Sequence, residues 1–323
     1  MNKAIRIHEN GGPEVLRWEE VPLEKPGPGE VLLKHTAVGL NFIDIYQRAG
    51  LYPLELPQTL GMEGAGVIEE VGEGVTDFSP GGRVGYAMRL GSYSERRVID
   101  CSLLVAIPDS IEDRTAAAMM LQGMTAMYLI RRTHLVQPGE TILVSAAAGG
   151  VGLILCQWAN HLGATVIGCV GSEAKAELAR TFGCAHTILY REEDVVSRVR
   201  EITGGKGVPV VYDSVGKDTF ESSIDSLAPF GTLASFGNAS GPVEPFNPLI
   251  LSSKGSLFFT RQNLATHIAS RELLEDASKQ LFDVVLSGAV KININQTYPL
   301  AETAEAHRNL EQRKTTGSTV LIP

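Results

Sequence analysis

The stretch with the clearest chemical meaning is the glycine-rich sequence AAGGVG at 147–152. It follows the pattern A-x-G-x-x-G, a variant of the G-x-G-x-x-G turn that holds the pyrophosphate of a dinucleotide. Gly149 would let the backbone approach a phosphate, and Gly152 would let the following helix lie close to the preceding strand. Gly150 and Val151, at the start of that helix, would add free N–H groups and the positive end of the helix dipole.

Such a turn binds a dinucleotide only when a strand precedes it and a helix follows it. Here Thr141–Ala146 reads as a strand, Leu153–Leu162 as an apolar helix ended by Gly163, and Ala164–Val170 as a second strand. A tight turn without a ligand and a membrane span are the alternatives. The βαβ spacing argues against the first, and glycines in a turn pattern argue against the second. We therefore expect a dinucleotide-binding unit.

The end of the second strand indicates which dinucleotide is bound. Domains specific for NAD usually carry Asp or Glu there, where it grips the ribose hydroxyls of the adenosine. This chain has Gly171 and Ser172 instead, and Lys175 follows on the first turn of the next helix, where its ammonium could reach a 2′-phosphate. These residues predict NADPH, although Glu173 could turn toward a ribose and favour NADH.

The pattern of alternating strands and helices extends well beyond this unit. Further helices are expected at Glu173–Phe182, Glu193–Ile202 and Thr219–Leu227, and further strands at His186–Leu189, Val208–Asp213, Thr232–Phe236 and Ser256–Thr260. Such repetition predicts a parallel, doubly wound sheet with helices on both faces. Residues before about Pro108 instead alternate as short strands between turns. One more helix is expected at Arg271–Ser287, and strand-like segments with polar turns from Lys291 onward.

Composition excludes several classes of function. The chain has 323 residues, enough for two domains, and 28 basic against 37 acidic residues give a net charge of −9. That charge argues against a nucleic-acid partner and against an anionic membrane surface. The four cysteines form no C-x-x-C motif, and the N-terminus shows no apolar signal segment. We expect reduced thiols, no membrane insertion and a cytoplasmic location.

The whole chain resembles the medium-chain dehydrogenase/reductase superfamily and, within it, the zinc-free quinone oxidoreductases related to zeta-crystallin. The motifs that carry the resemblance are AVGLNFIDIYQRAGLYP at 37–53, LGMEGAGVI at 60–68, SAAAGGVGLILCQWA at 145–159, YREED at 190–194, VVYDSVG at 210–216, SFGNASG at 235–241 and TTGSTVLIP at 315–323. The resemblance implies an α/β protein with two domains. A GroES-like, β-rich catalytic domain would comprise 1–123 and 265–323, and a Rossmann NADPH-binding domain would comprise 124–264.

The same resemblance implies which residues form the site. Asn41, Tyr46 and Tyr52 would line the substrate cleft as catalytic residues. The further cofactor contacts that it implies are Phe42, Ile43, Asp44, Thr125, Tyr190, Ser214, Phe236, Asn238, Phe258 and Arg313. Tyr190 and Arg313 would join Lys175 around the 2′-phosphate of NADPH.

The residue types argue against a metal. Zinc-dependent members of the superfamily place cysteine and histidine where this chain has Asn41 and Met62. A carboxamide and a thioether are poor ligands for Zn²⁺, which prefers thiolate, imidazole or carboxylate. Glu63 remains beside Met62, but one carboxylate does not make a site. We therefore expect no metal.

Three functions are consistent with the sequence. The resemblance favours NADPH-dependent reduction of quinones, which are electron-poor and do not require a Lewis acid. A reductase of enones or other activated alkenes on the same scaffold is the alternative. A non-enzymatic structural or RNA-binding role, as in some zeta-crystallin relatives, is the third, and the net charge of −9 counts against RNA.

The strand expected at Ser256–Thr260 bears on oligomeric state. It is apolar and closes the series of strands, so in a monomer it would be an exposed sheet edge. Pairing of two such edges across a two-fold axis would cover them. We expect a homodimer.

Overall fold

The computed structural model describes residues 2–323, which divide into two compact units. The first unit comprises the chain up to Met124 together with His267–Leu286 and Ile292–Pro323. The second comprises Thr125–Thr266 and Ser287–Lys291.

The second unit is built on one parallel sheet of six strands. These strands are β9 (Thr141–Ser145), β10 (Thr165–Val170), β11 (His186–Leu189), β12 (Val208–Asp213), β13 (Leu227–Ser235) and β14 (Phe258–Arg261). Their order in the sheet is β11-β10-β9-β12-β13-β14, and every neighbouring pair is parallel. This is the Rossmann order, in which the strand order reverses between β9 and β12, and ligands bind beyond the carboxyl ends of the strands at that point.

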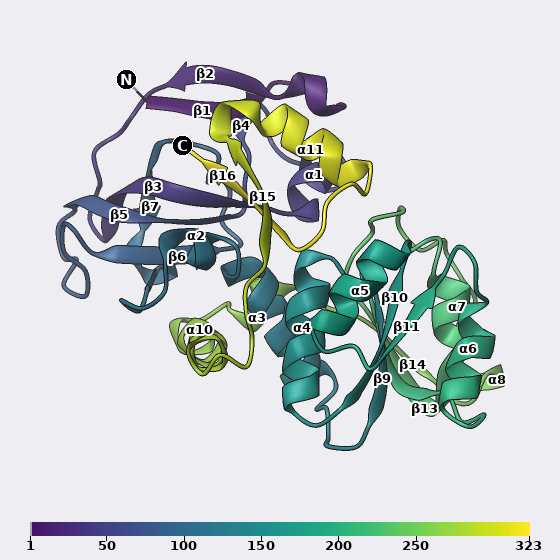
Figure 1. Cartoon of the computed structure of the whole chain (residues 1–323). Coiled ribbons are helices and arrows are strands. Elements are labelled where there is room, and N and C mark those ends of the chain that lie inside the picture. The colour runs from purple at the N-terminus through teal and green to yellow at the C-terminus, as the bar shows by residue number, and fades with distance from the viewer. Residues whose placement is uncertain (1) are drawn as a thin grey trace. The chain divides into compact units, whose positions relative to one another are not determined.

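Helices cover both faces of this sheet, with α4 and α5 together on one side and α6 and α7 on the other (Figure 1). The helices that follow the first strands are α4 (Gly150–His161), α5 (Glu173–Thr181), α6 (Val195–Ile202), α7 (Phe220–Asp225) and α8 (Leu249–Ser253). Val199 of α6 and Phe220 of α7 pack on Leu143 and Val211 of the central strands in one buried cluster. The predicted doubly wound α/β domain is thus confirmed.

The first unit is rich in antiparallel strands. They are β1 (Asn2–Ile7), β2 (Arg17–Val21), β3 (Glu30–Leu40), β4 (Gln58–Thr59), β5 (Glu63–Val71), β6 (Arg83–Ala87), β7 (Arg96–Asp100), β8 (Val105–Ala106), β15 (Ile294–Pro299) and β16 (Ser318–Ile322). One sheet has the order β2-β1-β4. The larger has the order β15-β16-β3-β5-β6-β8, with β7 also paired to β3. The long strand β3 therefore pairs with β5, β7 and the C-terminal β16.

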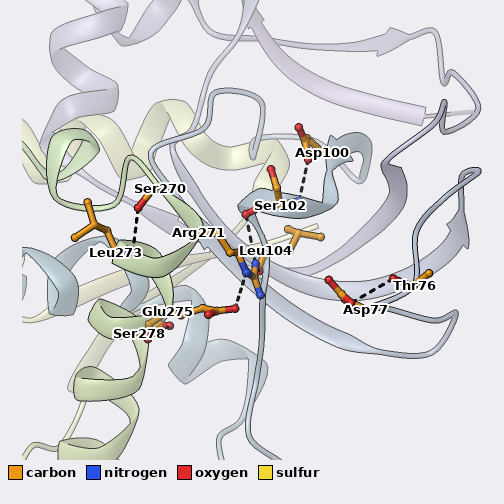
Figure 2. Close-up of polar contacts among 10 residues, drawn as sticks. All are labelled: Thr76, Asp77, Asp100, Ser102, Leu104, Ser270, Arg271, Leu273, Glu275 and Ser278. Atoms are coloured by element: carbon orange, nitrogen blue, oxygen red, sulfur yellow. Dashed lines mark hydrogen bonds and ion pairs between the residues drawn. The ribbon is translucent and has the colours of Figure 1, made fainter.

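Helices of 5 to 16 residues complete the first unit. They are α1 (Phe42–Arg48), α2 (Asp113–Ala117), α10 (Arg271–Leu286) and α11 (Thr303–Glu311), while α3 (Met120–Tyr128) and α9 (Leu264–His267) run across the unit boundaries. Arg271 ties α10 to the segment before β8, because its guanidinium donates to the carbonyl oxygens of Leu104 at 2.5 Å and Ser102 at 3.3 Å (Figure 2). The same side chain pairs with Glu275 one turn later at 2.7 Å.

The C-terminal tail departs from the prediction. Strand-like segments and polar turns are expected after Lys291, and β15 and β16 are present, but Thr303–Glu311 is helix α11. Its buried face consists of Thr303, Ala306 and His307. A face with so little apolar character leaves no hydrophobic period in the sequence, which is why the helix is missed. Among residues 2–323, no helix is both long and apolar enough to cross a membrane.

Candidate functional site

The glycine-rich turn leaves β9 and opens α4. The strand ends at Ser145, one residue earlier than expected, because Ala146 takes a left-handed conformation with φ +51°. Gly149 caps α4 in extended backbone, and the helix itself begins at Gly150. A Cβ at Gly152 would lie 2.4 Å from the carbonyl oxygen of Ala146. The turn and the helix can approach this closely only with glycine there, which is the packing that the last glycine of a dinucleotide-binding turn provides.

The carboxyl ends of β12 and β13 lie next to each other and are organised by Asp213. Its buried carboxylate accepts hydrogen bonds from the backbone N–H of Val215 at 2.7 Å and the hydroxyl groups of Thr219 at 2.6 Å and Ser223 at 2.9 Å. The loop that it fixes contains the predicted cofactor contact Ser214. Sequence reasoning did not identify Asp213, although an Asp at a strand end followed by Ser and Gly is a typical signal for a turn.

The other predicted contacts on this edge lie close to Ser214. The N–H of Phe236 donates to the carbonyl oxygen of Asp213 at 2.8 Å, and the N–H of Ala239 donates to that of Ser214 at 3.2 Å. Asn238 lies between them in the same loop. The structure therefore brings Ser214, Phe236 and Asn238 together.

At the end of β10, Gly171 lies beneath Tyr190. A Cβ at Gly171 would come within 2.8 Å of the tyrosine hydroxyl, so the glycine makes room for that ring. Ser172 caps α5, and Lys175 follows in the first turn of that helix. Glu173, the residue that could favour NADH, forms an ion pair with Arg180. Arg180 also donates to the hydroxyl of Thr187 at 2.7 Å, which directs Glu173 toward α5 and β11.

In the first unit, Asn41 is held by a chain of buried hydrogen bonds. Its Nδ2 donates to Oε2 of Glu63 at 2.7 Å, and its Oδ1 accepts from Nε2 of Gln122 at 3.1 Å. The hydroxyl of Ser318 donates to Oε1 of Gln122 at 2.7 Å, and the N–H of Leu121 donates to Oε1 of Glu63 at 2.7 Å. Burial raises the pKa of Glu63 to about 8, while the hydrogen bonds from Asn41 and Leu121 act in the opposite direction.

Sequence reasoning found Asn41 but not its partners. Gln122 and Ser318 lie 81 and 277 residues along the chain from Asn41, as 122 − 41 and 318 − 41, and neither belongs to a polar pattern. Glu63 was noted only as an insufficient metal ligand. The one sequence signal is a charged residue directly before the strand-like GAGVI, where burial would require a partner.

Asp44, another of the predicted cofactor contacts, lies inside the first unit. Its side chain has no exposed surface, and its Oδ2 accepts from the backbone N–H of Asn41 at 2.8 Å and the hydroxyl of Tyr93 at 2.8 Å. Burial raises the pKa of Asp44 to about 7, and those two hydrogen bonds lower it. Through Oδ2 the carboxylate fixes the start of α1, while its Oδ1 is buried without a hydrogen-bond partner.

The aromatic residues predicted for the cleft are neighbours on and after α1. The rings of Tyr46 and Tyr52 meet edge to face with centroids 5.3 Å apart, and the ring of Phe42 lies 6.0 Å from that of Tyr46. Tyr46 is 8% exposed, while Tyr52, Phe42 and Ile43 are half-buried. Tyr46 and Tyr52 can therefore form one aromatic wall.

The remaining predicted contacts are scattered. Thr125 is buried in α3, Phe258 is 60% exposed on the edge strand β14, and Arg313 is exposed after α11 in a left-handed conformation with φ +57°. Gly150 and Val151 form the first turn of α4. Arg313 belongs to the first unit, whereas Thr125, Phe258 and the glycine-rich turn belong to the second.

The residues at the ligand positions of zinc-dependent relatives do not fit zinc. The Asn41 carboxamide is engaged by Glu63 and Gln122, and the Met62 sulfur accepts from Nε2 of Gln47 at 3.3 Å. Within the described part of the chain, no group of three or more His, Cys, Asp or Glu side chains could hold a metal ion.

Cys156 and Cys184, which are distant in sequence, lie with their sulfur atoms 3.4 Å apart, and all four cysteines are free thiols.

Comparison with known proteins agrees with this architecture. The family described as "Alcohol dehydrogenase GroES-like domain" matches residues 27–138, and "Zinc-binding dehydrogenase" matches residues 150–284. A quinone oxidoreductase of Pseudomonas aeruginosa is 53% identical, and a 2-haloacrylate reductase of Burkholderia sp. is 49% identical. The alignments cover the whole of this chain and 100% and 99% of those two proteins.

A solved structure is equally similar. The crystal structure of Escherichia coli quinone oxidoreductase complexed with NADPH superposes with a TM-score of 0.97 at 48% identity, covering 99% of this chain and 100% of that one. Sequence, strand order and the glycine-rich turn therefore lead to the same assignment. The chain belongs to the quinone oxidoreductases of the medium-chain dehydrogenase/reductase superfamily.

Proposed function

We propose that the chain is an NADPH-dependent quinone reductase that works without a metal. The observation that carries the proposal is the dinucleotide turn at Gly149–Gly152, in which the backbone of β9 and α4 leaves a cradle that only glycine permits at Gly152. The choice of quinone as acceptor is supported by the full-length relative from Pseudomonas aeruginosa. We further propose that the first unit is the catalytic domain and the second the NADPH-binding domain.

The second unit has the features needed to hold NADPH. The turn and the first N–H groups of α4 would bind the pyrophosphate, and the loops after β12 and β13 would border the rest of the cofactor. Gly171 leaves room beside Tyr190, and Lys175 would supply positive charge for the 2′-phosphate. When bound, NADPH supplies the hydride for the reduction.

The residues of the first unit would orient the acceptor. The carboxamide of Asn41 has a second N–H beyond the one given to Glu63, and it can donate to a quinone oxygen as negative charge builds there. The rings of Tyr46 and Tyr52 would form an apolar wall for the quinone ring. A quinone becomes aromatic on reduction, so orientation and exclusion of water suffice without a Lewis acid.

Reduction of activated alkenes is a second candidate. The 2-haloacrylate reductase is 49% identical over the full chain, and a haloacrylate carries a C=C bond conjugated to a carboxylate. Such a substrate would also accept hydride from NADPH. Its carboxylate would need a cationic partner, which the polar residues proposed for the cleft, Asn41, Tyr46 and Tyr52, do not provide.

An assay of NADPH oxidation separates the candidates. The purified chain, treated with a chelator, is mixed with NADPH and a panel of 1,4-quinones, enones and 2-haloacrylates. The loss of absorbance at about 340 nm is followed, because reduced nicotinamide is consumed when it gives up its hydride. We expect turnover with quinones that exceeds turnover with alkenes and survives chelation. Faster reduction of alkenes would select the second candidate, and loss of activity restored by zinc would contradict the metal-free mechanism.

We also propose that the protein is a cytoplasmic homodimer paired through β14. This strand is the edge of the parallel sheet, and exposed apolar side chains gather around it: Phe230 is 72%, Leu249 71% and Phe258 60% exposed. Phe230 also has φ +63°, which is costly for a bulky residue and is more readily understood if the ring makes a contact outside the chain. The four free thiols fit a reducing compartment.

The dimer is tested by sedimentation equilibrium at micromolar concentration. Wild type is expected to have twice the mass of the chain. Phe230→Asn should weaken association at least about ten-fold, the equivalent of 1.4 kcal/mol. It should not lower the melting temperature of the monomer, measured at high dilution, because asparagine tolerates the left-handed conformation better than phenylalanine. A monomeric wild type, or a variant that associates as tightly, would contradict pairing through this surface.

A further inference from the structure

We propose that Glu63 is a positioning residue whose carboxylate sets which end of the Asn41 carboxamide is held inside the protein and which end is left for a ligand. This inference rests on the proposed function, because Asn41 is proposed to bind the acceptor. Glu63 lies at the start of β5, has no exposed surface and does not touch solvent. A buried carboxylate in a catalytic domain is costly, so its partners indicate its task.

The hydrogen bonds around Glu63 all run in one direction. Ser318 donates to Gln122 at 2.7 Å, Gln122 to Asn41 at 3.1 Å, and Asn41 to Glu63 at 2.7 Å. The opposite oxygen of Glu63 accepts from the N–H of Leu121 at 2.7 Å. An ionised carboxylate only accepts, so the atom of Asn41 that faces it must be the nitrogen. Glu63 therefore sets the direction of all the hydrogen bonds from Ser318 to Asn41.

The packing around Glu63 keeps the carboxylate in this place. A Cβ at Gly39, in β3, would lie 2.3 Å from Oε2 of Glu63 and 2.3 Å from the carbonyl oxygen of Ala117. The missing side chain at Gly39 thus creates the space that Oε2 occupies while it accepts from Asn41. This observation is independent of the hydrogen bonds and points to the same arrangement.

Replacing Glu63 by glutamine would reverse the direction of this series of hydrogen bonds without breaking any link between its members. The N–H of Leu121 requires an oxygen at the Oε1 position, so the amide nitrogen of the glutamine would face Asn41. Asn41 would then present its oxygen, and Gln122 would turn over in response. Ser318 can accept from the turned Gln122 and give its single hydroxyl hydrogen to the carbonyl oxygen of Ala118, 3.1 Å away, instead of to Gln122. Each of the four side chains keeps a hydrogen bond to its neighbour, so the fold should survive while the donor and acceptor ends of Asn41 exchange places.

Protonation of Glu63 would have the same effect as the glutamine. Burial raises the pKa of Glu63 to about 8, so a neutral Glu63 that needs an acceptor becomes favoured as the pH falls through that value. Other titratable groups surround it: Asp44 in α1, His35 in β3, Tyr86 in β6 and Tyr93. Burial lowers the pKa of His35 to about 3 and raises those of both tyrosines. Asp44, with its pKa raised to about 7, is thus the competing group, and Glu63→Gln distinguishes the two.

The test compares wild type, Glu63→Gln and Ser318→Ala in the NADPH–quinone assay. Glu63→Gln should keep its melting temperature and its NADPH dissociation constant but lose roughly a hundred- to a thousand-fold in kcat, as when a donor to developing charge is removed. The wild-type kcat should fall as the pH is lowered through about 8, and Glu63→Gln should lack this step. Ser318→Ala removes the last donor without reversing the chain, so it should lower the melting temperature more and kcat less than Glu63→Gln.

Failure of the proposed role of Glu63 can be distinguished from failure of the proposed quinone reductase function. A wild type that does not reduce quinones removes the proposed function. An active wild type with unchanged kcat and pH profile in Glu63→Gln overturns the positioning role. If Glu63→Gln does not fold, the wild-type profile can still contradict the inference: a kcat that is flat between about pH 6.5 and about pH 9, on either side of about 8, would do so.

Discussion

Gly152→Ala is expected to destabilise the second unit and to weaken NADPH binding at the same time. The new methyl group would lie 2.4 Å from the carbonyl oxygen of Ala146 and 2.8 Å from the carbonyl carbon of Ala147. Both neighbours are backbone atoms of the turn, so they can move only if the turn itself shifts. Overpacking of this kind typically costs about 1–3 kcal/mol. Thermal unfolding should show the loss, and a fluorescence titration should show at least about ten-fold weaker NADPH binding, the equivalent of 1.4 kcal/mol.

Gly149→Ala is the matched control for the loss of stability expected in Gly152→Ala. At this position the nearest atom to a new Cβ is the carbonyl oxygen of Ala146 at 3.2 Å, and the backbone is extended with φ −81°. The carbonyl oxygen of Ala146 would have to move by only a few tenths of an ångström, so the free energy of unfolding should stay within about 1 kcal/mol of wild type. NADPH binding should still weaken, because the methyl group would occupy the path along which the pyrophosphate approaches the backbone. If Gly152→Ala matched wild type in both measurements, the close packing of the turn would not matter for the site.

Lys175→Ala is expected to raise the Michaelis constant for NADPH sharply and to leave that for NADH nearly unchanged. One or two charge-assisted contacts to a 2′-phosphate contribute roughly 1.5–3 kcal/mol each, enough for a ten-fold preference or more. NADH lacks this phosphate and should not be affected. Steady-state kinetics with both cofactors measure the change. Equal use of the two cofactors by wild type would show that the assignment of Lys175, Tyr190 and Arg313 is wrong.

Arg180→Ala provides a comparison within the same helix. Arg180 pairs with Glu173 and so holds the carboxylate that could otherwise bind the ribose hydroxyls of NADH. Without Arg180, the Michaelis constant for NADH should fall. The preference for NADPH over NADH should therefore decrease, as in Lys175→Ala, where it decreases because the Michaelis constant for NADPH rises. A variant whose Michaelis constant for NADH stays at the wild-type value would indicate that Glu173 does not reach the cofactor.

The amino-acid sequence by itself determined the second unit and its glycine-rich turn. Strands β9 to β13 and helices α4 to α7 follow one another along the chain, each with its own local pattern, so the alternation is readable without tertiary contacts. The turn is readable for the same reason, because Gly149 and Gly152 act through neighbours only a few residues away. Most boundaries moved by one or two residues, as at Ala146, where a left-handed conformation ends the strand. Two starts differ more: α4 begins at Gly150 instead of Leu153, and β13 begins at Leu227 instead of Thr232.

Only the tertiary structure decided what surrounds Asn41 and where α11 lies. Glu63, Gln122 and Ser318 reach Asn41 from β5, α3 and β16, and the bonds between them span 22 to 196 residues of chain. No local pattern encodes such a meeting, because each polar residue looks like an ordinary surface residue until the sheets are assembled. Helix α11 was not predicted for a related reason: its buried face holds His307, whose burial is stabilised by Arg48 and Tyr93, far away in the sequence. The chemistry of Asn41 could be expected from its residue type, but its orientation depends on contacts that exist only in the folded chain.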